Sequence, residues 1–265
     1  MTYSCAACAA AFPAKCSANR EWEALFQQWL TSVNRAKGYY PQGREADWVP
    51  PIPSVERSIQ EQRETQARIA LENRTLTDVC WLVESYEGNL PEQQQKQEFI
   101  LYSVKQATQI PELLVEPLLK TSLYQDPSSN AEYIYPCLRS FGPRKINEIL
   151  LHYFETGTNE EKIGAVFAFY WSLRDFQKPT RRFGVVPYEN IDDLRARIRY
   201  AFLTMFLHNE DVSLRRHLIS EITRHNFTGL PYPEDTPELL RQVLRIARSK
   251  LYGLKHRHKQ NRNKS

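Results

Sequence analysis

The chain has 265 residues, and its 42% hydrophobic content is enough to bury a core, which excludes a disordered protein. Glycine is scarce, with nine residues, and neither a G-x-x-x-x-G-K-[ST] nor a G-x-G-x-x-G run occurs. Nucleotide-dependent chemistry therefore lacks its usual phosphate-binding signature. Runs of alternating Val, Ile and Thr are also missing, so the composition favours helix throughout.

The net charge of +4 is distributed unevenly. From Thr236 to the end, nine Lys and Arg residues accompany one acid, a balance of +8, whereas the 26 basic and 30 acidic residues before it balance to −4. A basic character confined to one end favours a specific acidic partner over general attraction to polyanions. The alternative is a solvated, disordered tail.

Localisation follows from the missing apolar segments and from the cysteines. No stretch of about 18 apolar residues exists, so we expect no membrane span, and residues 1–15 lack the basic start of a signal peptide. The five cysteines are an odd number, typical of a reducing compartment. We expect a cytoplasmic protein, or a nuclear one if the source is eukaryotic, with Cys80 and Cys137 buried as small apolar residues.

The N-terminal part of the chain divides into two segments. Residues 1–17 read as a flexible leader, and residues 18–73 as N-terminal helices joined by a Pro-rich connector. Trp22, Phe26 and Trp29 recur at spacings of three and four, which predicts a helix over 17–35. Four prolines between residues 39 and 53 interrupt it. A polar helix with a thin apolar stripe is expected over 54–73.

In residues 74–226, apolar helical segments alternate regularly with short breaks. The predicted helices span 76–86, 91–108, 112–124, 129–141, 144–155, 160–173, 191–207 and 212–225. Ser129 and Thr158 are each followed three residues later by glutamate, the pattern of a capping box. A long loop over 174–192, with two prolines and a glycine, interrupts the rhythm and is a candidate functional element.

An internal repeat of about thirty residues underlies this rhythm. Residues 118–141 align with residues 150–173 at an offset of 32, and residues 201–216 and 76–104 resemble the same helical hairpin. A helix ending in an Asp- and Asn-rich turn, followed by Val or Ala and then Arg, resembles the HEAT repeat, and residues 209–216 match it best. Thr158 replaces the aspartate in the second aligned copy, and the arginine is absent from the first and second.

The HEAT resemblance implies an all-α fold, an α-solenoid of antiparallel helix pairs with an N-terminal helical extension and a basic C-terminal helix. Other helical-repeat classes and a non-repetitive bundle remain alternatives. The last helix begins at Thr236, which we expect to cap it ahead of Pro237. Residues 227–254 form the expected capping helix of the solenoid, and residues 255–265 a basic disordered tail.

Metal and catalytic patterns are weak. Cys5, Cys8 and Cys16 supply only three thiolates, whereas a structural zinc site needs four ligands. His217, Glu221 and His225 share one side of a helix, but the outer two are about 12 Å apart at 1.5 Å per residue, so a solvated polar face is the better interpretation. No Gly-x-Ser-x-Gly elbow or other nucleophile motif occurs. We therefore predict no metal, no cofactor and no catalytic residue. These patterns favour a protein that is not an enzyme, without deciding the question.

Arginines are the most coherent candidate binding residues. They lie in the loop, on the helices that follow it and on the last helix, where they could form a basic strip. The candidates are Arg181, Arg182, Arg195, Arg199, Arg215, Arg216, Arg245 and Arg248.

The first functional hypothesis is a non-catalytic scaffold that holds a protein partner on the concave solenoid face, lined by the second helices of successive repeats. The second is nucleic-acid binding through the C-terminal basic strip, because the HEAT-like proteins that this chain resembles include base-repair DNA glycosylases. The oligomeric state is not indicated by the sequence.

Overall fold

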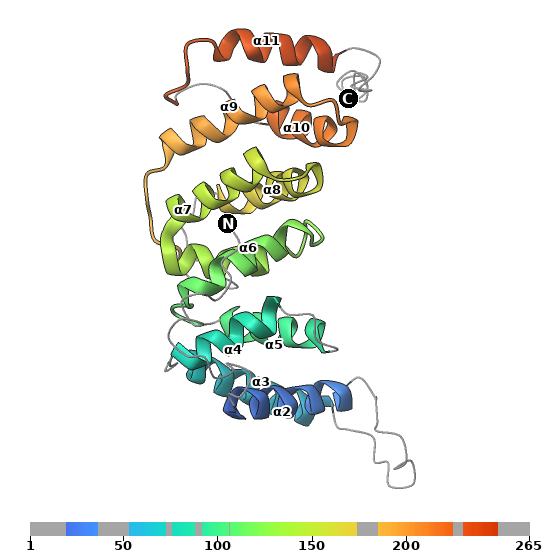
Figure 1. Ribbon diagram of the computed structural model, residues 1–265, viewed down its shortest axis with the longest axis vertical. Coiled ribbons are helices and arrows are strands. Elements are labelled where there is room, and N and C mark those ends of the chain that lie inside the picture. The colour runs from blue at the N-terminus through green and yellow to red at the C-terminus, as the bar shows by residue number, and fades with distance from the viewer. Residues whose placement is uncertain are drawn as a thin grey trace, which may run out of the picture. The chain divides into compact units, whose positions relative to one another are not determined.

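The computed structural model describes residues 20–36, 53–72, 76–87, 92–105, 107–173, 185–224 and 230–248. Within these ranges all regular secondary structure is helical, which confirms the predicted all-α class (Figure 1). The helices are α2 (Arg20–Ala36), α3 (Pro53–Glu72), α4 (Leu76–Glu87), α5 (Gln93–Lys105), the 3-10 helix η3 (Glu112–Leu114), α6 (Val115–Leu123), α7 (Ala131–Thr156), α8 (Asn159–Ser172), α9 (Asp192–His208), α10 (Val212–Arg224) and α11 (Thr236–Ala247). The predicted leader, most of the Pro-rich connector and the basic tail lie outside the described residues.

The helix bounds agree with the predicted ones to within a few residues, with one informative difference. The segments predicted over 129–141 and 144–155 form a single helix, α7, that bends at Gly142. Gly142 has φ of +79°, a conformation that side chains disfavour, and Pro143 follows it without a backbone N–H. The two predicted helices therefore correspond to the two helical segments on either side of Gly142.

Three caps were predicted, and the structure confirms one. Thr158 accepts from the Glu161 backbone N–H while the Glu161 carboxylate accepts from Thr158 N–H, so the capping box of α8 is complete. The box predicted at Ser129 is wrong, because the Ser129 hydroxyl donates to the Asp126 carbonyl instead and Asn130 takes the N-cap position. Thr236 is likewise the first residue of α11 rather than its cap, and Asp235 precedes it.

The chain divides into two compact units. Unit 1 comprises residues 1–121, 132–140 and 178–186, and unit 2 comprises residues 122–131, 141–177 and 187–265. The predicted domain boundaries, at residues 17, 73, 226 and 254, do not coincide with this division and stay predictions.

Aromatic side chains make the core of unit 1. Phe99 of α5 lies 6.1 Å, 5.9 Å and 5.7 Å, between ring centroids, from Trp22, Phe26 and Trp29 of α2. Trp22 also stacks on Trp81 of α4 at 5.8 Å. These five aromatic residues are at most 3% exposed. Aromatic pairs of this kind stabilise a protein beyond the effect of burying their surface. The apolar stripe predicted for the first helix is therefore the inner face of α2.

An ion pair between a buried lysine and a partly exposed glutamate lies beside this core. Lys96 is 7% exposed, and its ammonium lies 2.9 Å from the Glu23 carboxylate. It also lies 5.3 Å and 5.4 Å from the ring centroids of Phe26 and Trp81. Burial alone would raise the pKa of Glu23, but hydrogen bonds from Lys96 and Gln27 and the Lys96 charge outweigh it and lower that pKa. The carboxylate thus compensates a cation that burial would otherwise penalise.

Cys137, in the part of α7 that belongs to unit 1, is fully buried and free of disulfides, as predicted. Burial raises the pKa of its thiol, which therefore stays protonated and apolar. The side chain of Cys80 lies outside the described residues.

The core of unit 2 lies between the second segment of α7, α8 and α9. Phe202 of α9 packs 5.1 Å from Phe154 of α7 and 5.8 Å from Phe169 of α8. A polar contact between two buried side chains lies beside this core: the Ser172 hydroxyl donates to Asn147 Oδ1 at 2.6 Å, and Asn147 Nδ2 donates to the Pro143 carbonyl at 2.8 Å. This pairing fixes α8 against α7 without leaving an unmade hydrogen bond.

Candidate protein-binding surface

The eight predicted arginines have different environments. Arg195 pairs with Asp192 at 3.1 Å and donates to the Leu173 carbonyl. Arg199 donates to the Tyr232 hydroxyl at 3.2 Å. Arg215 donates to the Leu207 carbonyl, and its guanidinium lies 5.5 Å from the Phe206 ring centroid. These three arginine side chains therefore make contacts within unit 2.

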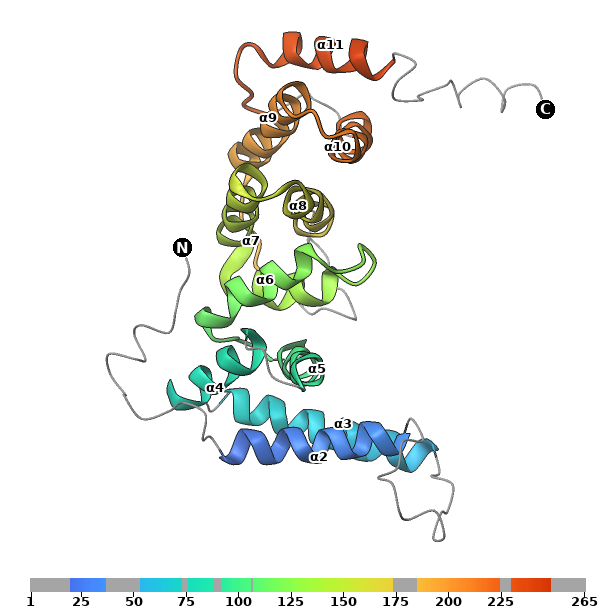
Figure 2. The same ribbon diagram turned by 45° about the vertical axis from the view of Figure 1, so that its right-hand side comes forward.

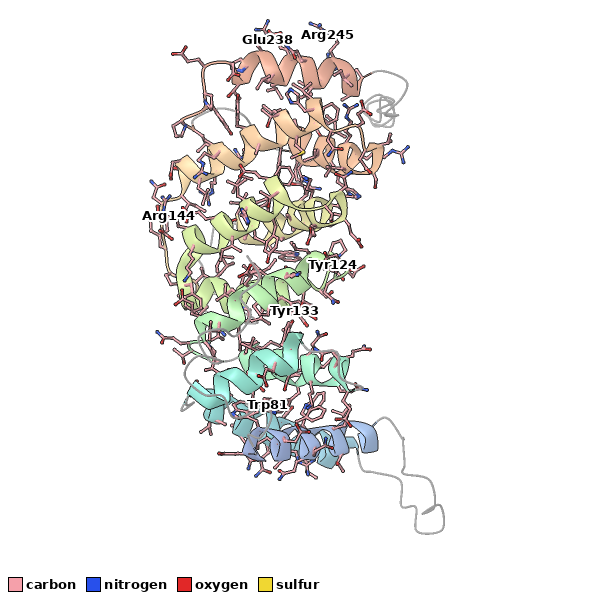
Figure 3. All side chains as sticks on the ribbon, in the orientation of Figure 1. Trp81, Tyr124, Tyr133, Arg144, Glu238 and Arg245 are labelled. Atoms are coloured by element: carbon pink, nitrogen blue, oxygen red, sulfur yellow. The ribbon has the colours of Figure 1, made fainter. Side chains whose placement is uncertain are left out.

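The remaining arginines are exposed or undescribed. Arg216 on α10, Arg245 on α11 and Arg248 at its end face solvent, and Figure 3 labels Arg245. Arg181 and Arg182 lie outside the described residues. The partner-binding role of the eight stays a prediction, but a strip made of all of them would have to recruit three that already have partners inside unit 2.

Helix α8 carries a feature that the predicted site did not include. From Ile163 to Leu173 it has no charged residue. Its inner face, with Ala165, Val166 and Phe169, is buried. On the opposite side Ile163, Phe167 and Trp171 are half-buried and Tyr170 is 41% exposed. We call these last four residues the outer face of α8.

Helix α10 lies beside α8 and borders this outer face (Figure 2). The His217 ring stands edge-on to Phe167, with centroids 4.8 Å apart. Arg224 lies 5.5 Å from the Tyr170 ring centroid and pairs with Glu221 at 2.6 Å. An aromatic strip with an arginine at its edge has the composition that protein interfaces favour.

The predicted solvated polar face on α10 is wrong in part. Glu221 is only 8% exposed, because its carboxylate folds back onto Arg224. Burial lowers the pKa of His217, so the folded protein favours the neutral imidazole beside Phe167. Among the described residues no group of His, Cys, Asp and Glu could hold a metal ion. His225, Cys5, Cys8 and Cys16 lie outside the described part of the chain.

A hollow of about 380 Å³ opens at one end of the outer face, where α6 ends and where α8 and α10 begin. Its walls combine rings and carboxylates, and we call it the acid-aromatic hollow. The side chains that define it are Tyr124, Glu160, Ile163, Phe167 and Asp211. Leu123, Gln125, Asn159 and Gly164 complete the lining.

Tyr124 is held in place by its hydroxyl. It follows the C-terminal end of α6 (Figure 3), its hydroxyl donates to the Glu161 carboxylate at 2.9 Å, and its side chain is 50% exposed. Burial, then the Glu161 hydrogen bond and the Glu161 and Glu160 charges, raise the pKa of Tyr124 to about 12. The Tyr124 hydroxyl therefore stays protonated, and its hydrogen bond to Glu161 orients a ring that lines the hollow.

The floor of the hollow depends on Gly164. A Cβ at this position would overlap the Leu123 carbonyl oxygen and lie 2.6 Å from the carbonyl carbon. Only glycine allows the α8 backbone to touch the end of α6 this closely.

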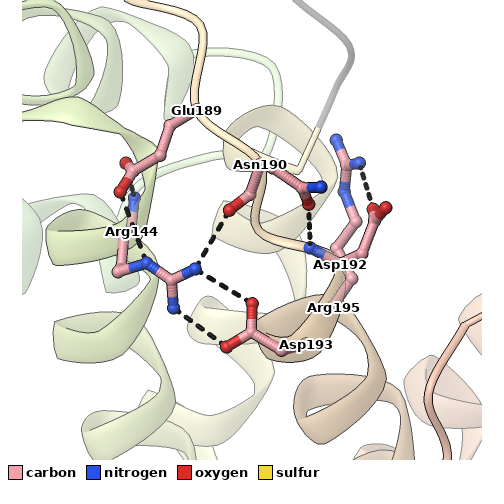
Figure 4. A network of polar contacts seen from close by, with 6 residues as sticks. All are labelled: Arg144, Glu189, Asn190, Asp192, Asp193 and Arg195. Atoms are coloured by element: carbon pink, nitrogen blue, oxygen red, sulfur yellow. Dashed lines mark hydrogen bonds and ion pairs between the residues drawn. The ribbon is translucent and has the colours of Figure 1, made fainter.

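A second polar cluster secures the segment before α9 (Figure 4). Arg144 donates to both carboxylate oxygens of Asp193, at 2.9 Å and 3.0 Å, and to the Asn190 carbonyl at 3.0 Å. Glu189 accepts from the Arg144 backbone N–H at 2.9 Å. The Arg144 hydrogen bonds lower the pKa of Asp193 to about 2. Every charge in this cluster has a partner, so it joins residues 189–193 to α7 and offers no free binding group.

Among the described residues the protein is all-helical, and its α8 and α10 carry partly exposed aromatic side chains beside one another. Comparison with known proteins adds no relative: no family model matches the chain, and neither a curated protein nor a solved structure gives a significant match. Among the described helices, none is long and apolar enough to cross a membrane.

Proposed function

We propose that this chain is a protein-binding module, and that its partner covers the outer face of α8. The observation that supports this most directly is the absence of charge from Ile163 to Leu173 on a helix whose outer face is only partly covered, with Tyr170 exposed and Ile163, Phe167 and Trp171 half-buried. A helix that is apolar all round normally has both sides buried. Partly exposed apolar side chains that gather on one face, as Ile163, Phe167, Tyr170 and Trp171 do here, are typical of interaction sites in soluble proteins.

We further propose that unit 2 is a short HEAT-like stack of helical hairpins, the second helices α8 and α10 forming its binding side. In support, α10 packs on both α9 and α8, and α11 packs on α9. The hairpin turns also meet, because Asn209 Nδ2 donates to Asn159 Oδ1 at 2.9 Å. The Arg215 guanidinium joins α10 to α9 through the Leu207 carbonyl. This arrangement is a proposal for unit 2 alone.

A protein partner fits this surface better than a nucleic acid. Neutral rings dominate the outer face of α8, whereas nucleic-acid affinity rests mainly on cations that neutralise phosphates. Arg195, Arg199 and Arg215 are bound inside unit 2. Nucleic-acid binding by the basic C-terminal residues stays a prediction, which a gel shift repeated at rising salt would test.

The substitution Tyr170→Glu tests the proposed surface. It places a carboxylate on the outer face of α8, where a covering partner would have to remove it from water. We expect at least a tenfold rise in the dissociation constant of the partner, about 1.4 kcal/mol or more. The partner would be isolated by affinity capture on the full chain, and its dissociation constant would then be measured with purified components by biolayer interferometry.

Tyr188→Glu is the matched control, because Tyr188 is an 80% exposed tyrosine of unit 2 outside α8 and α10. It should leave the dissociation constant within about twofold of the wild-type value. Equal affinities for Tyr170→Glu and wild type would contradict the proposal. So would a homodimer in analytical ultracentrifugation that Tyr170→Glu dissociates, because a second copy would then cover the face.

A further inference from the structure

The acid-aromatic hollow differs from the outer face of α8 in carrying negative charge. Among the described residues, neither Glu160 nor Asp211 is paired with a basic side chain. Asp211 uses Oδ1 to accept from the Leu214 backbone N–H at 2.7 Å, which caps α10. Glu160 is exposed in the first turn of α8. Two acidic residues thus line one hollow, and within the described part of the chain neither has a basic counter-ion.

The basic side chains nearest to it in sequence have other contacts. The Lys162 ammonium donates to the Gly157 carbonyl. Arg215 is held by the Leu207 carbonyl and by the Phe206 ring. Among the described residues, neither of these two cations is seen to form an ion pair with Glu160 or Asp211.

The rings of the hollow define which cation fits. Tyr124 and Phe167 present aromatic surface beside Glu160 and Asp211. A guanidinium is flat, stacks on aromatic faces and donates two parallel hydrogen bonds to a carboxylate, whereas an ammonium is a compact, strongly hydrated charge. The volume of about 380 Å³ is at the lower end of ligand-pocket sizes and suits one side chain with its neighbouring backbone.

We propose that the acid-aromatic hollow takes an arginine side chain of the bound protein partner, with the guanidinium between the Tyr124 and Phe167 rings and paired with Glu160 and Asp211. This inference rests on the proposed function, because the arginine belongs to the partner that covers α8. It adds a charged anchor at one end of an otherwise apolar contact, which would fix the register of the partner on α8 and α10.

The test uses the full chain, with N-acetyl-arginine N-methylamide as the probe and the Ile163 δ-methyl NMR signal as the reporter. At constant ionic strength we expect a saturable shift of this signal. The isosteric but uncharged N-acetyl-citrulline N-methylamide should bind at least tenfold more weakly. The double variant Glu160→Gln, Asp211→Asn should lose arginine binding at least tenfold, while asparagine still caps α10.

Glu155→Gln is the matched control, because Glu155 is an exposed carboxylate of α7 outside the hollow, and it should keep wild-type arginine binding. Equal binding of the arginine and citrulline probes, or unchanged arginine binding in the double variant, would overturn the inference. The proposed function would survive that result if Tyr170→Glu still weakened the protein partner. If Tyr170→Glu leaves partner affinity unchanged, the proposed function itself fails.

Discussion

Replacing Phe99 with alanine should lower the free energy of unfolding of unit 1 by about 3–5 kcal/mol, the range for deleting a fully buried phenylalanine. Phe99 is 1% exposed and contacts Trp22, Phe26 and Trp29, so its removal leaves a cavity that three large rings cannot easily fill. Urea unfolding followed by tryptophan fluorescence would measure the loss. Three of the five tryptophans, Trp22, Trp29 and Trp81, lie in this core and report on it directly.

Ile69→Ala is the comparison for this variant. Ile69 is 47% exposed on α3, so the same kind of truncation should cost about 1 kcal/mol or less. A loss below about 1.5 kcal/mol for Phe99→Ala would mean that Phe99 does not occupy the centre of unit 1.

Gly164→Ala should destabilise unit 2 by about 3 kcal/mol or more, although alanine is the better helix former by about 0.5–1 kcal/mol. The added Cβ would overlap the Leu123 carbonyl oxygen, and a backbone atom cannot turn aside as a flexible side chain can. Helix propensity therefore predicts that Gly164→Ala raises stability, whereas close packing predicts that it lowers stability. Thermal unfolding followed by far-UV circular dichroism would show which effect dominates.

Ser220→Ala on the exposed side of α10 is the control, because it adds helix propensity where no close approach is required. It should change stability by at most about 0.5 kcal/mol. A Gly164→Ala variant as stable as wild type, or more stable, would rule out the close contact between α8 and the end of α6.

Much of the fold could be predicted because helix position depends on local patterns. The stripe containing Trp22 and Trp29 gave the buried side of α2, and Thr158 with Glu161 gave the start of α8. The Ser129 prediction failed although its pattern was as good, because Asp126 forms a local turn that uses the Ser129 hydroxyl. A capping pattern therefore predicts a cap only where no nearby acceptor competes for the side chain.

The candidate surface was harder to predict because it depends on which side chains already have contacts inside the folded protein. Sequence alone cannot tell an arginine held inside the protein, such as Arg215, from an exposed one such as Arg216. The uncharged stretch from Ile163 to Leu173 is evident in the sequence, but it is equally typical of a helix buried on all sides. Only the exposure of Tyr170 and the partial exposure of Phe167 distinguish the two cases.

Photocrosslinking from α8 tests directly whether a partner covers this helix. The full chain would carry p-benzoylphenylalanine at position 170 or at position 188, and each form would be irradiated together with the partner isolated on the wild-type chain. We expect the partner to crosslink efficiently from position 170 on α8 and at background level from position 188. Crosslinking from position 188 with none from position 170 would show that the partner binds elsewhere, and that the aromatic face of α8 is not the binding surface.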